Sequence, residues 1–187
     1  MARISFAFLA VALVLPVTAP NSTAGEINAA HPVKSPYAHD RARAIKALDQ
    51  RAIDDLLSGN GAGLALAAEL NGYPGPRHVL ELADALALDP GQRRATARLR
   101  DDMQAKASAL GDEIVAAEVA LDRAFADRTV DRAVVHARAA GIAALKGRLR
   151  AVHLEAHLAQ AALLTPSQNA RYAELRGYSA DGGHRDR

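Results

Sequence analysis

Apolar residues recur every three or four positions along most of the chain, which is the period of an amphipathic α-helix. The first of the two longest apolar stripes consists of Leu99, Met103, Leu110, Ile114, Ala117 and Leu121. The second consists of Val135, Ile142, Leu145, Leu149, Val152, Ala156, Ala159 and Leu163. A polar stretch over residues 126–129 separates them, with Thr129 as a candidate helix cap. The pattern therefore predicts two long antiparallel helices, ending near residues 125 and 163, joined by a short turn.

Shorter stretches with the same period flank this hairpin. They predict helices over about residues 40–57, 64–70 and 79–88 before it, and a last helix from residue 166 to a stop at Gly177. No Lys-Ser or Lys-Thr pair follows the glycine-rich segment 58–63, so we interpret this segment as a helix end and linker, not a phosphate-binding loop. The predicted fold class is all-α: a long antiparallel helical hairpin with short flanking helices.

A five-residue phrase occurs twice in nearly the same form, 76 residues apart. The copies are Leu88-Asp89-Pro90-Gly91-Gln92 and Leu164-Thr165-Pro166-Ser167-Gln168. Asp or Thr can cap a helix, Pro suits the first helical position, and the Gln side chain can bond back to the backbone N–H of the cap residue. We interpret both copies as helix starts, one for the helix that enters the hairpin and one for the helix that leaves it.

Glycines interrupt both long stripes at positions that the turn relates to each other. If the turn centres near residue 128, Gly111 falls opposite Gly147 and Ile114 opposite Ile142. Because glycine inside a helix costs up to about 1 kcal/mol relative to alanine, paired interior glycines suggest that the two backbones approach closely there.

The N-terminus has the pattern of a secretory signal peptide. Arg3 precedes 14 apolar residues, and Ser22-Thr23-Ala24 offers a cleavage site. Fourteen residues fall short of the roughly 20 that span a bilayer as a helix, which favours a cleaved signal peptide. An uncleaved inner-membrane anchor is the alternative. The predicted organisation is a signal peptide over residues 1–24, a flexible leader over 25–39, one all-helical domain over 40–178 and a disordered tail over 179–187.

Composition narrows the classes of function. Half of the 187 residues are hydrophobic, which suffices for one domain with a core. The 23 basic and 21 acidic residues alternate, so the chain lacks the basic stripe of a nucleic-acid-binding protein. There is no cysteine, so an exported form has no disulfides.

The doubled phrase in an exported, cysteine-free, all-helical chain resembles the LTxxQ-motif proteins of the bacterial periplasm, the Spy/CpxP-like family, which includes the metal-responsive ZraP and CnrX. The resemblance covers about residues 76–178. The second copy of the phrase matches the family motif fully, while the first has Asp89 in place of Thr.

The resemblance implies a thin, curved helical hairpin in the periplasm, often paired as a homodimer. It implies that the concave side holds unfolded or misfolded envelope proteins without ATP, as part of an envelope stress response. A membrane sensor protein is a further partner that the family implies. No cofactor is required for such a function.

Candidate chemistry is sparse, because the signatures of nucleophilic and metalloprotease enzymes are missing from the sequence, and we expect no catalysis. His153 and His157 are four apart on one helix face and could share Zn, Ni, Co or Cu, with Met103 opposite as a soft ligand. The alternative interpretation is that both histidines are half-exposed residues on the flank of the seam. A periplasmic heavy-metal-binding or sensing protein of the ZraP/CnrX type is therefore the alternative function.

Overall fold

The computed structural model of the chain describes residues 34–178. The described residues from Tyr37 on belong to one compact unit. The predictions of a signal peptide, of most of the leader and of a disordered tail fall outside the described residues. Within residues 34–178 the structure is all-helical, as predicted, with no strand.

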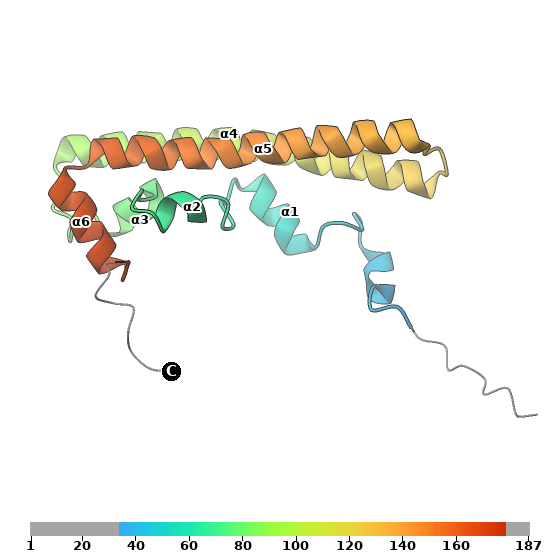
Figure 1. Cartoon of the computed structure of the whole chain (residues 1–187), viewed down its shortest axis with the longest axis horizontal. Helices are drawn as coiled ribbons and strands as arrows, with labels where there is room; N and C mark the ends of the chain where they lie inside the picture. The colour runs from blue at the N-terminus through green and yellow to red at the C-terminus, as the bar shows by residue number, and fades with distance from the viewer. Residues whose placement is uncertain (1–33, 179–187) are drawn as a thin grey trace, which may run out of the picture. The chain divides into compact units, whose positions relative to one another are not determined.

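The largest element is a pair of long antiparallel helices, α4 (Pro90–Ala126) and α5 (Arg132–Leu163), which run side by side (Figure 1). Their seam contains the buried residues Ala107, Leu110, Ile114 and Leu149. Every residue of the two predicted stripes is buried or half-buried except Ala159, which is exposed. The adjacent Gln160 is buried instead, and its Nε2 donates to Thr96 Oγ1. The long hairpin is thus confirmed as a packed helix pair.

The turn between the two long helices differs from the prediction in its cap. Asp131, not Thr129, caps α5: its carboxylate accepts the Val134 N–H at 2.8 Å. Thr129 serves the preceding helix instead, since its N–H and its hydroxyl both reach Ala124 O. The reason is that Arg128 adopts a left-handed conformation, φ +55°, which ends α4. The cap of α5 is therefore Asp131, two residues after the predicted cap.

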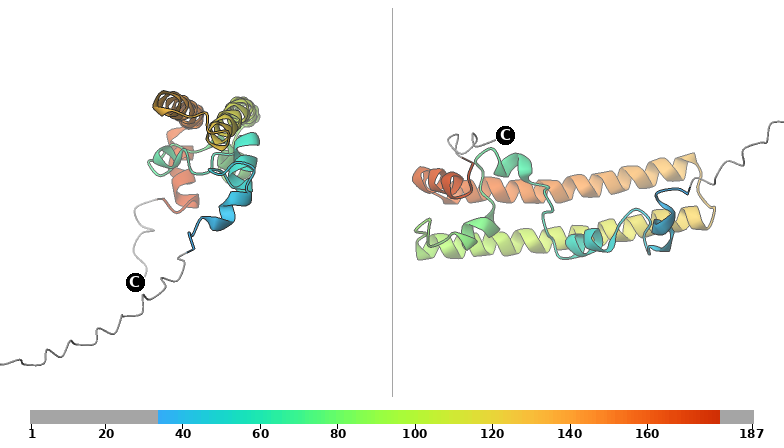
Figure 2. Two further views of the ribbon diagram at one scale, coloured as in Figure 1. Left: turned by 90° about the vertical axis from the view of Figure 1, so that its right-hand side faces the viewer. Right: turned by 90° about the horizontal axis from the view of Figure 1, so that it is seen from below.

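The segment before the hairpin forms short helices along one side of it. They are the 3-10 helix η1 (Ala38–Ala42), α1 (Gln50–Leu57), α2 (Leu66–Glu69) and α3 (Pro76–Glu81). Viewed from below, this segment starts under α4, crosses to α5 at α2 and returns toward α4 at α3 (Figure 2). It closes the same face of the hairpin along most of its length.

The predicted continuous helix over residues 40–57 is wrong. The chain is extended at Arg43, and α1 begins only after Asp49, whose carboxylate accepts the Ala52 N–H at 2.8 Å. Capping by Asp49 offers the backbone an alternative to continuing the helix. Ile45 between them is buried and Lys46 pairs with Asp122 of α4, so tertiary contacts hold the break.

The predicted helix over residues 79–88 is also shorter than expected. Helix α3 starts at Pro76 and ends at Glu81, and turns follow up to Ala87, which has φ +48°. The Leu88 N–H then bonds to Ala83 O. This closure leads the chain directly into the cap of α4.

Gly111 and Gly147 do not meet, which corrects the predicted close approach of α4 and α5. A Cβ at Gly111 would lie 2.0 Å from Leu56 O, so the space left by this glycine receives the end of α1. A Cβ at Gly147 would meet nothing within 4 Å. The register of the two long helices could not reveal this, because a third segment packs on the same seam.

The last helix, α6 (Pro166–Leu175), turns away from α5 and closes the open end of the hairpin (Figure 1). A core joins it to the α3 region, and Leu88 and Leu164, the first residues of the two repeated phrases, are both in it. Its other buried members are Val79, Ala83, Leu86 and Tyr172. Both predicted capping boxes are present, with Asp89 and Gln92 in one and Thr165 and Gln168 in the other.

The two repeated phrases bind each other through their glutamines. Gln92 Nε2 donates to Gln168 Oε1 at 2.8 Å, and Gln168 Nε2 donates to Gln92 Oε1 at 3.0 Å. Each amide also donates to a backbone carbonyl, Leu163 O for Gln92 and Leu86 O for Gln168. We call this four-bond arrangement the glutamine clasp; it fastens the start of α4 to the start of α6.

We expect Gln92→Ala and Gln168→Ala each to lower the free energy of unfolding by about 1–2 kcal/mol, because each removes a cap bond and opens the clasp. Either change alone breaks the amide pair. The loss of unfolding free energy in the double variant should therefore be about 1 kcal/mol smaller than the sum of the losses in the two single variants. Urea unfolding of the four proteins measures this coupling. Gln50→Ala, which removes an exposed glutamine bonded to Asp54, is the control and should change stability by less than about 0.5 kcal/mol. Strict additivity would contradict the clasp.

Among the described residues, no helix has the length and apolar character needed to cross a membrane.

Candidate functional site

A pocket of about 600 Å³ lies between the hairpin and residues 58–78, a segment that we call the strap. The strap supplies the glycine-rich turn 59–63, α2 and the first residues of α3. From the hairpin, Met103 of α4 and His153 and His157 of α5 line the pocket. The three residues that the sequence suggested as metal ligands thus all line this pocket.

Both histidines are buried, which corrects the interpretation that they are half-exposed flank residues. His153 is 3% exposed and His157 9%. The strap covers them at two glycines: a Cβ at Gly61 would lie 3.4 Å from His153 Nδ1, and one at Gly75 would lie 3.0 Å from His157 Nε2. At Gly75 a side chain would push against the imidazole, so the strap lies this close because the residue there is glycine.

The two imidazoles differ in their bonding. His157 Nδ1 lies 2.7 Å from Tyr73 O, and since a carbonyl only accepts, Nδ1 carries the proton. His153 Nε2 is buried without a hydrogen-bond partner. Burial, with a smaller contribution from His157, lowers the pKa of His153 below 6.5, because a charged imidazolium would lose its hydration there.

The depressed pKa of His153 predicts a loss of stability in acid. As the pH falls through 6.5, the unfolded chain takes up a proton at this residue more readily than the folded chain, so the equilibrium shifts toward unfolding. We expect His153→Gln to reduce the difference in unfolding free energy between pH 7.5 and pH 5.5. His136→Gln, at an exposed position of the same helix, is the control and should leave that difference unchanged. Urea unfolding at the two pH values measures both.

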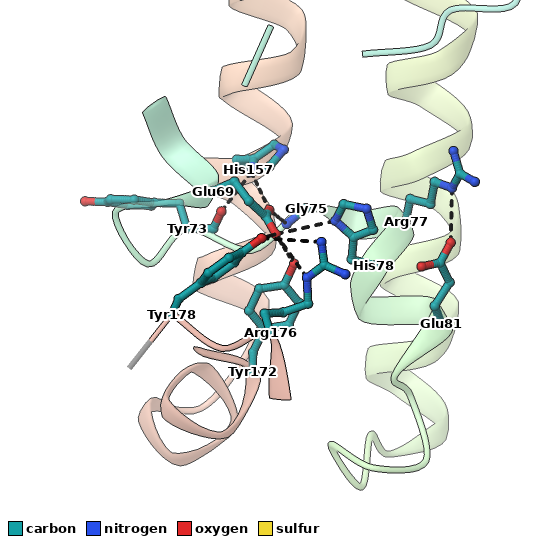
Figure 3. A network of polar contacts seen from close by, with 10 residues as sticks. All are labelled: Glu69, Tyr73, Gly75, Arg77, His78, Glu81, His157, Tyr172, Arg176 and Tyr178. Atoms are coloured by element: carbon teal, nitrogen blue, oxygen red, sulfur yellow. Dashed lines mark hydrogen bonds and ion pairs between the residues drawn. The ribbon is translucent and has the colours of Figure 1, made fainter. Parts of the chain in front are cut away.

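One wall of the pocket is a buried carboxylate, Glu69 at the end of α2, on which several segments converge (Figure 3). Its Oε1 accepts hydrogen bonds from the hydroxyls of Tyr172 and Tyr178, and its Oε2 accepts the Gly75 N–H at 3.1 Å. Three cationic or basic groups surround it: His78 Nδ1 at 3.4 Å, His157 Nδ1 at 3.6 Å and Arg176 Nε at 3.7 Å. We call this set the Glu69 network.

The Glu69 network connects α2, α3, α5 and α6 through one side chain. Tyr172 of α6 is 1% exposed, and burial together with its bond to Glu69 raises the pKa of its hydroxyl. The hydroxyl therefore stays protonated and serves as a permanent donor to the carboxylate. With both Glu69 oxygens bonded, the acid has a structural role in holding α6 against the strap.

The Glu69 network was not predicted from the sequence. Glu69 and Tyr172 are 103 residues apart, and neither belongs to a spaced motif. A weak signal was available, because Glu69 is an acidic residue in the otherwise apolar stretch 64–70. A carboxylate in such a stretch needs donors, but the sequence does not say which.

The described part of the chain contains no cluster of three or more His, Asp or Glu side chains arranged to hold a metal ion. His153, His157 and Met103 line the same pocket, and Nε2 of His153 is buried without a hydrogen-bond partner. Sequence comparison with models of known families and with curated proteins, and structural comparison with solved structures, find no match to this chain.

Proposed function

We propose that this protein is an exported, ATP-independent chaperone-like protein that binds non-native polypeptides in the periplasm, of the Spy/CpxP type. One observation carries the proposal: three large apolar side chains of a single short stretch of the strap are exposed. Leu66 is 55% exposed, Leu70 58% and Tyr73 42%. In the close-up the ring of Tyr73 points away from the Glu69 network (Figure 3). The repeated phrase and its resemblance to the LTxxQ-motif family add support.

The position of these side chains favours a binding surface. Leu66 and Leu70 are four residues apart in one helical turn, so they share a face. Exposed apolar side chains grouped in one short stretch favour contact with other apolar surface, unlike apolar residues scattered singly over a protein. Contacts of this kind need no nucleotide and release a client when it buries its own apolar residues.

The test is the aggregation of a chemically denatured client, followed by light scattering with equimolar amounts of the purified chain. We expect the wild-type protein to slow aggregation and Leu66→Ser with Leu70→Ser to reduce this effect at least fivefold. Phe125→Ser is the matched control, since Phe125 is 56% exposed but lies at the far end of α4. No protection by the wild type, or equal losses from both variants, would contradict the proposal.

A homodimer is part of the proposed function. Leu158 on α5 is 55% exposed, and Val134 and Leu154 of the same helix are half-buried, so α5 offers apolar surface to a second copy. Sedimentation equilibrium of the purified chain tests this, and a mass of 19.7 kDa at all concentrations would contradict it.

The second candidate function is metal binding or sensing, of the ZraP/CnrX type. The observation that favours it is the unpartnered Nε2 of buried His153 in the pocket that also contains His157 and Met103. Calorimetric titration with Zn, Ni, Co and Cu tests it. Binding tighter than about millimolar that is lost in His153→Ala with His157→Ala would support a metal site, and retention in that variant would exclude these ligands.

A further inference from the structure

The strap pocket combines an apolar interior with charged groups. Its apolar walls are Ala65, Leu66, Leu80 and Met103, contributed by the strap, α3 and α4. Its volume of about 600 Å³ is within the range of sites that bury small organic molecules. Met103 adds adaptability, because an unbranched thioether adjusts to irregular ligands.

The acidic groups of the pocket are already occupied. Glu69 has both oxygens bonded within its network. Glu81 pairs at 3.1 Å with Arg77, which also lines the pocket, so the two charges of this exposed pair balance each other within the lining. Neither carboxylate therefore offers an unpaired negative charge to a cationic ligand.

Arg100 of α4 differs from these groups because its ion-pair partner lies outside the pocket lining. Arg100 lines the pocket, and its guanidinium donates two hydrogen bonds to Oδ1 of Asp101, its neighbour in sequence, at 2.9 Å through Nε and at 2.5 Å through Nη2. Asp101 is 61% exposed and does not line the pocket. Such exposed pairs contribute about 0–1 kcal/mol, so a better placed anion can replace Asp101. The charge that the pocket offers to a ligand is thus positive, and it lies beside apolar walls.

We propose that the strap pocket binds a small organic monocarboxylate with an apolar body, with the carboxylate on the Arg100 guanidinium and the body against Met103 and Leu80. A planar guanidinium holds a carboxylate by two parallel hydrogen bonds, which fixes the orientation of the acid. The neutral imidazole of His153 adds uncharged surface beside the apolar body. This site shares Leu66 with the exposed apolar face of the strap but includes neither Leu70 nor Tyr73, and it does not depend on polypeptide binding.

The test is calorimetric titration of octanoate into the purified full chain in the presence of EDTA, with octanamide as the neutral analogue. We expect saturable binding of one octanoate per chain and at least tenfold weaker binding of octanamide. Arg100→Gln should weaken octanoate binding at least tenfold. Arg98→Gln is the matched control, since Arg98 is exposed on the same helix and does not line the pocket, and it should leave binding unchanged.

A second variant tests the location independently of charge. Gly61→Leu places a side chain in the pocket at a position where φ is not left-handed and where a Cβ meets only the His153 ring, at 3.4 Å or more. We expect this variant to bind octanoate at least tenfold more weakly than the wild type. Its circular dichroism spectrum should show the same helix content. Absence of saturable binding, equal binding of octanamide, or equal losses from Arg98→Gln and Arg100→Gln would overturn the proposal.

The C-terminus of a polypeptide also carries a carboxylate. A peptide that ends in leucine with a free carboxylate therefore distinguishes a polypeptide C-terminus from a small organic acid as the ligand. We expect it to bind more weakly than octanoate. Tighter binding of the peptide would assign the pocket to chain ends and overturn the assignment to a small acid.

Discussion

Gly111→Ala should detach α1 from the hairpin, although the same change in most helices is stabilising. The added methyl group would lie 2.0 Å from Leu56 O and 2.5 Å from Leu56 C, and backbone atoms cannot move aside as the tip of a side chain can. Forcing an extra carbon into a packed contact costs about 1–3 kcal/mol. We expect a net loss of about 2 kcal/mol in the free energy of unfolding, together with faster hydrogen exchange in residues 50–57.

Gly147→Ala is the matched control on the partner helix. A Cβ there meets nothing within 4 Å, so alanine should contribute only its better helix propensity and raise stability by up to about 1 kcal/mol. Urea unfolding measures both variants, and exchange monitored by mass spectrometry locates the loss. If the two alanine variants shift stability in the same direction by similar amounts, α1 does not dock against Gly111.

Glu69→Ala should be the most destabilising single change at the pocket. It removes the acceptor of Tyr172 and of the Gly75 N–H, both buried, and leaves them without a partner. Unsatisfied buried groups cost about 1–3 kcal/mol each, and Arg176 and His78 can turn to solvent, so we expect a total loss of about 3 kcal/mol. Because the network holds α6 against the strap, hydrogen exchange should increase first in residues 166–175.

Two tyrosine variants separate the bonds within this network. Tyr172→Phe removes a buried hydroxyl that donates to Glu69 and should cost about 1–2 kcal/mol. Tyr178→Phe removes a donor that is partly exposed and 3.4 Å away, and it should cost less than about 0.5 kcal/mol. Equal effects in urea unfolding would show that the network is less specific than its geometry indicates.

The long helices could be predicted because their signal is local and repeated. Eight apolar positions at helical spacing outweigh any single residue, so the range of α5 was correct to a few residues. The short helices failed for the opposite reason. The break at residues 43–49 depends on the cap of Asp49, on the burial of Ile45 and on the pair of Lys46 with Asp122, and the last of these spans 76 residues.

The candidate site shows the same division. The spacing of His153 and His157 placed them on one face, and the register of the hairpin placed Met103 opposite them; in the structure all three line the same pocket. Their burial could not be predicted, since it comes from Gly61, in a segment that the sequence indicated only as a linker, and from Gly75, which lies between the predicted helices 64–70 and 79–88. Glu69 was missed because its partners come from segments that meet only in the folded chain.

The repeated phrase separates what the sequence determined from what the tertiary structure decided. Asp89, Gln92, Thr165 and Gln168 determined two helix starts by themselves, because a capping box needs residues only three positions apart. That the two glutamines then bind each other was decided by the packing of the α3 region and α6 at the end of the hairpin. A side-chain amide has more donors and acceptors than its own cap uses, and only the fold determines which distant group satisfies the rest.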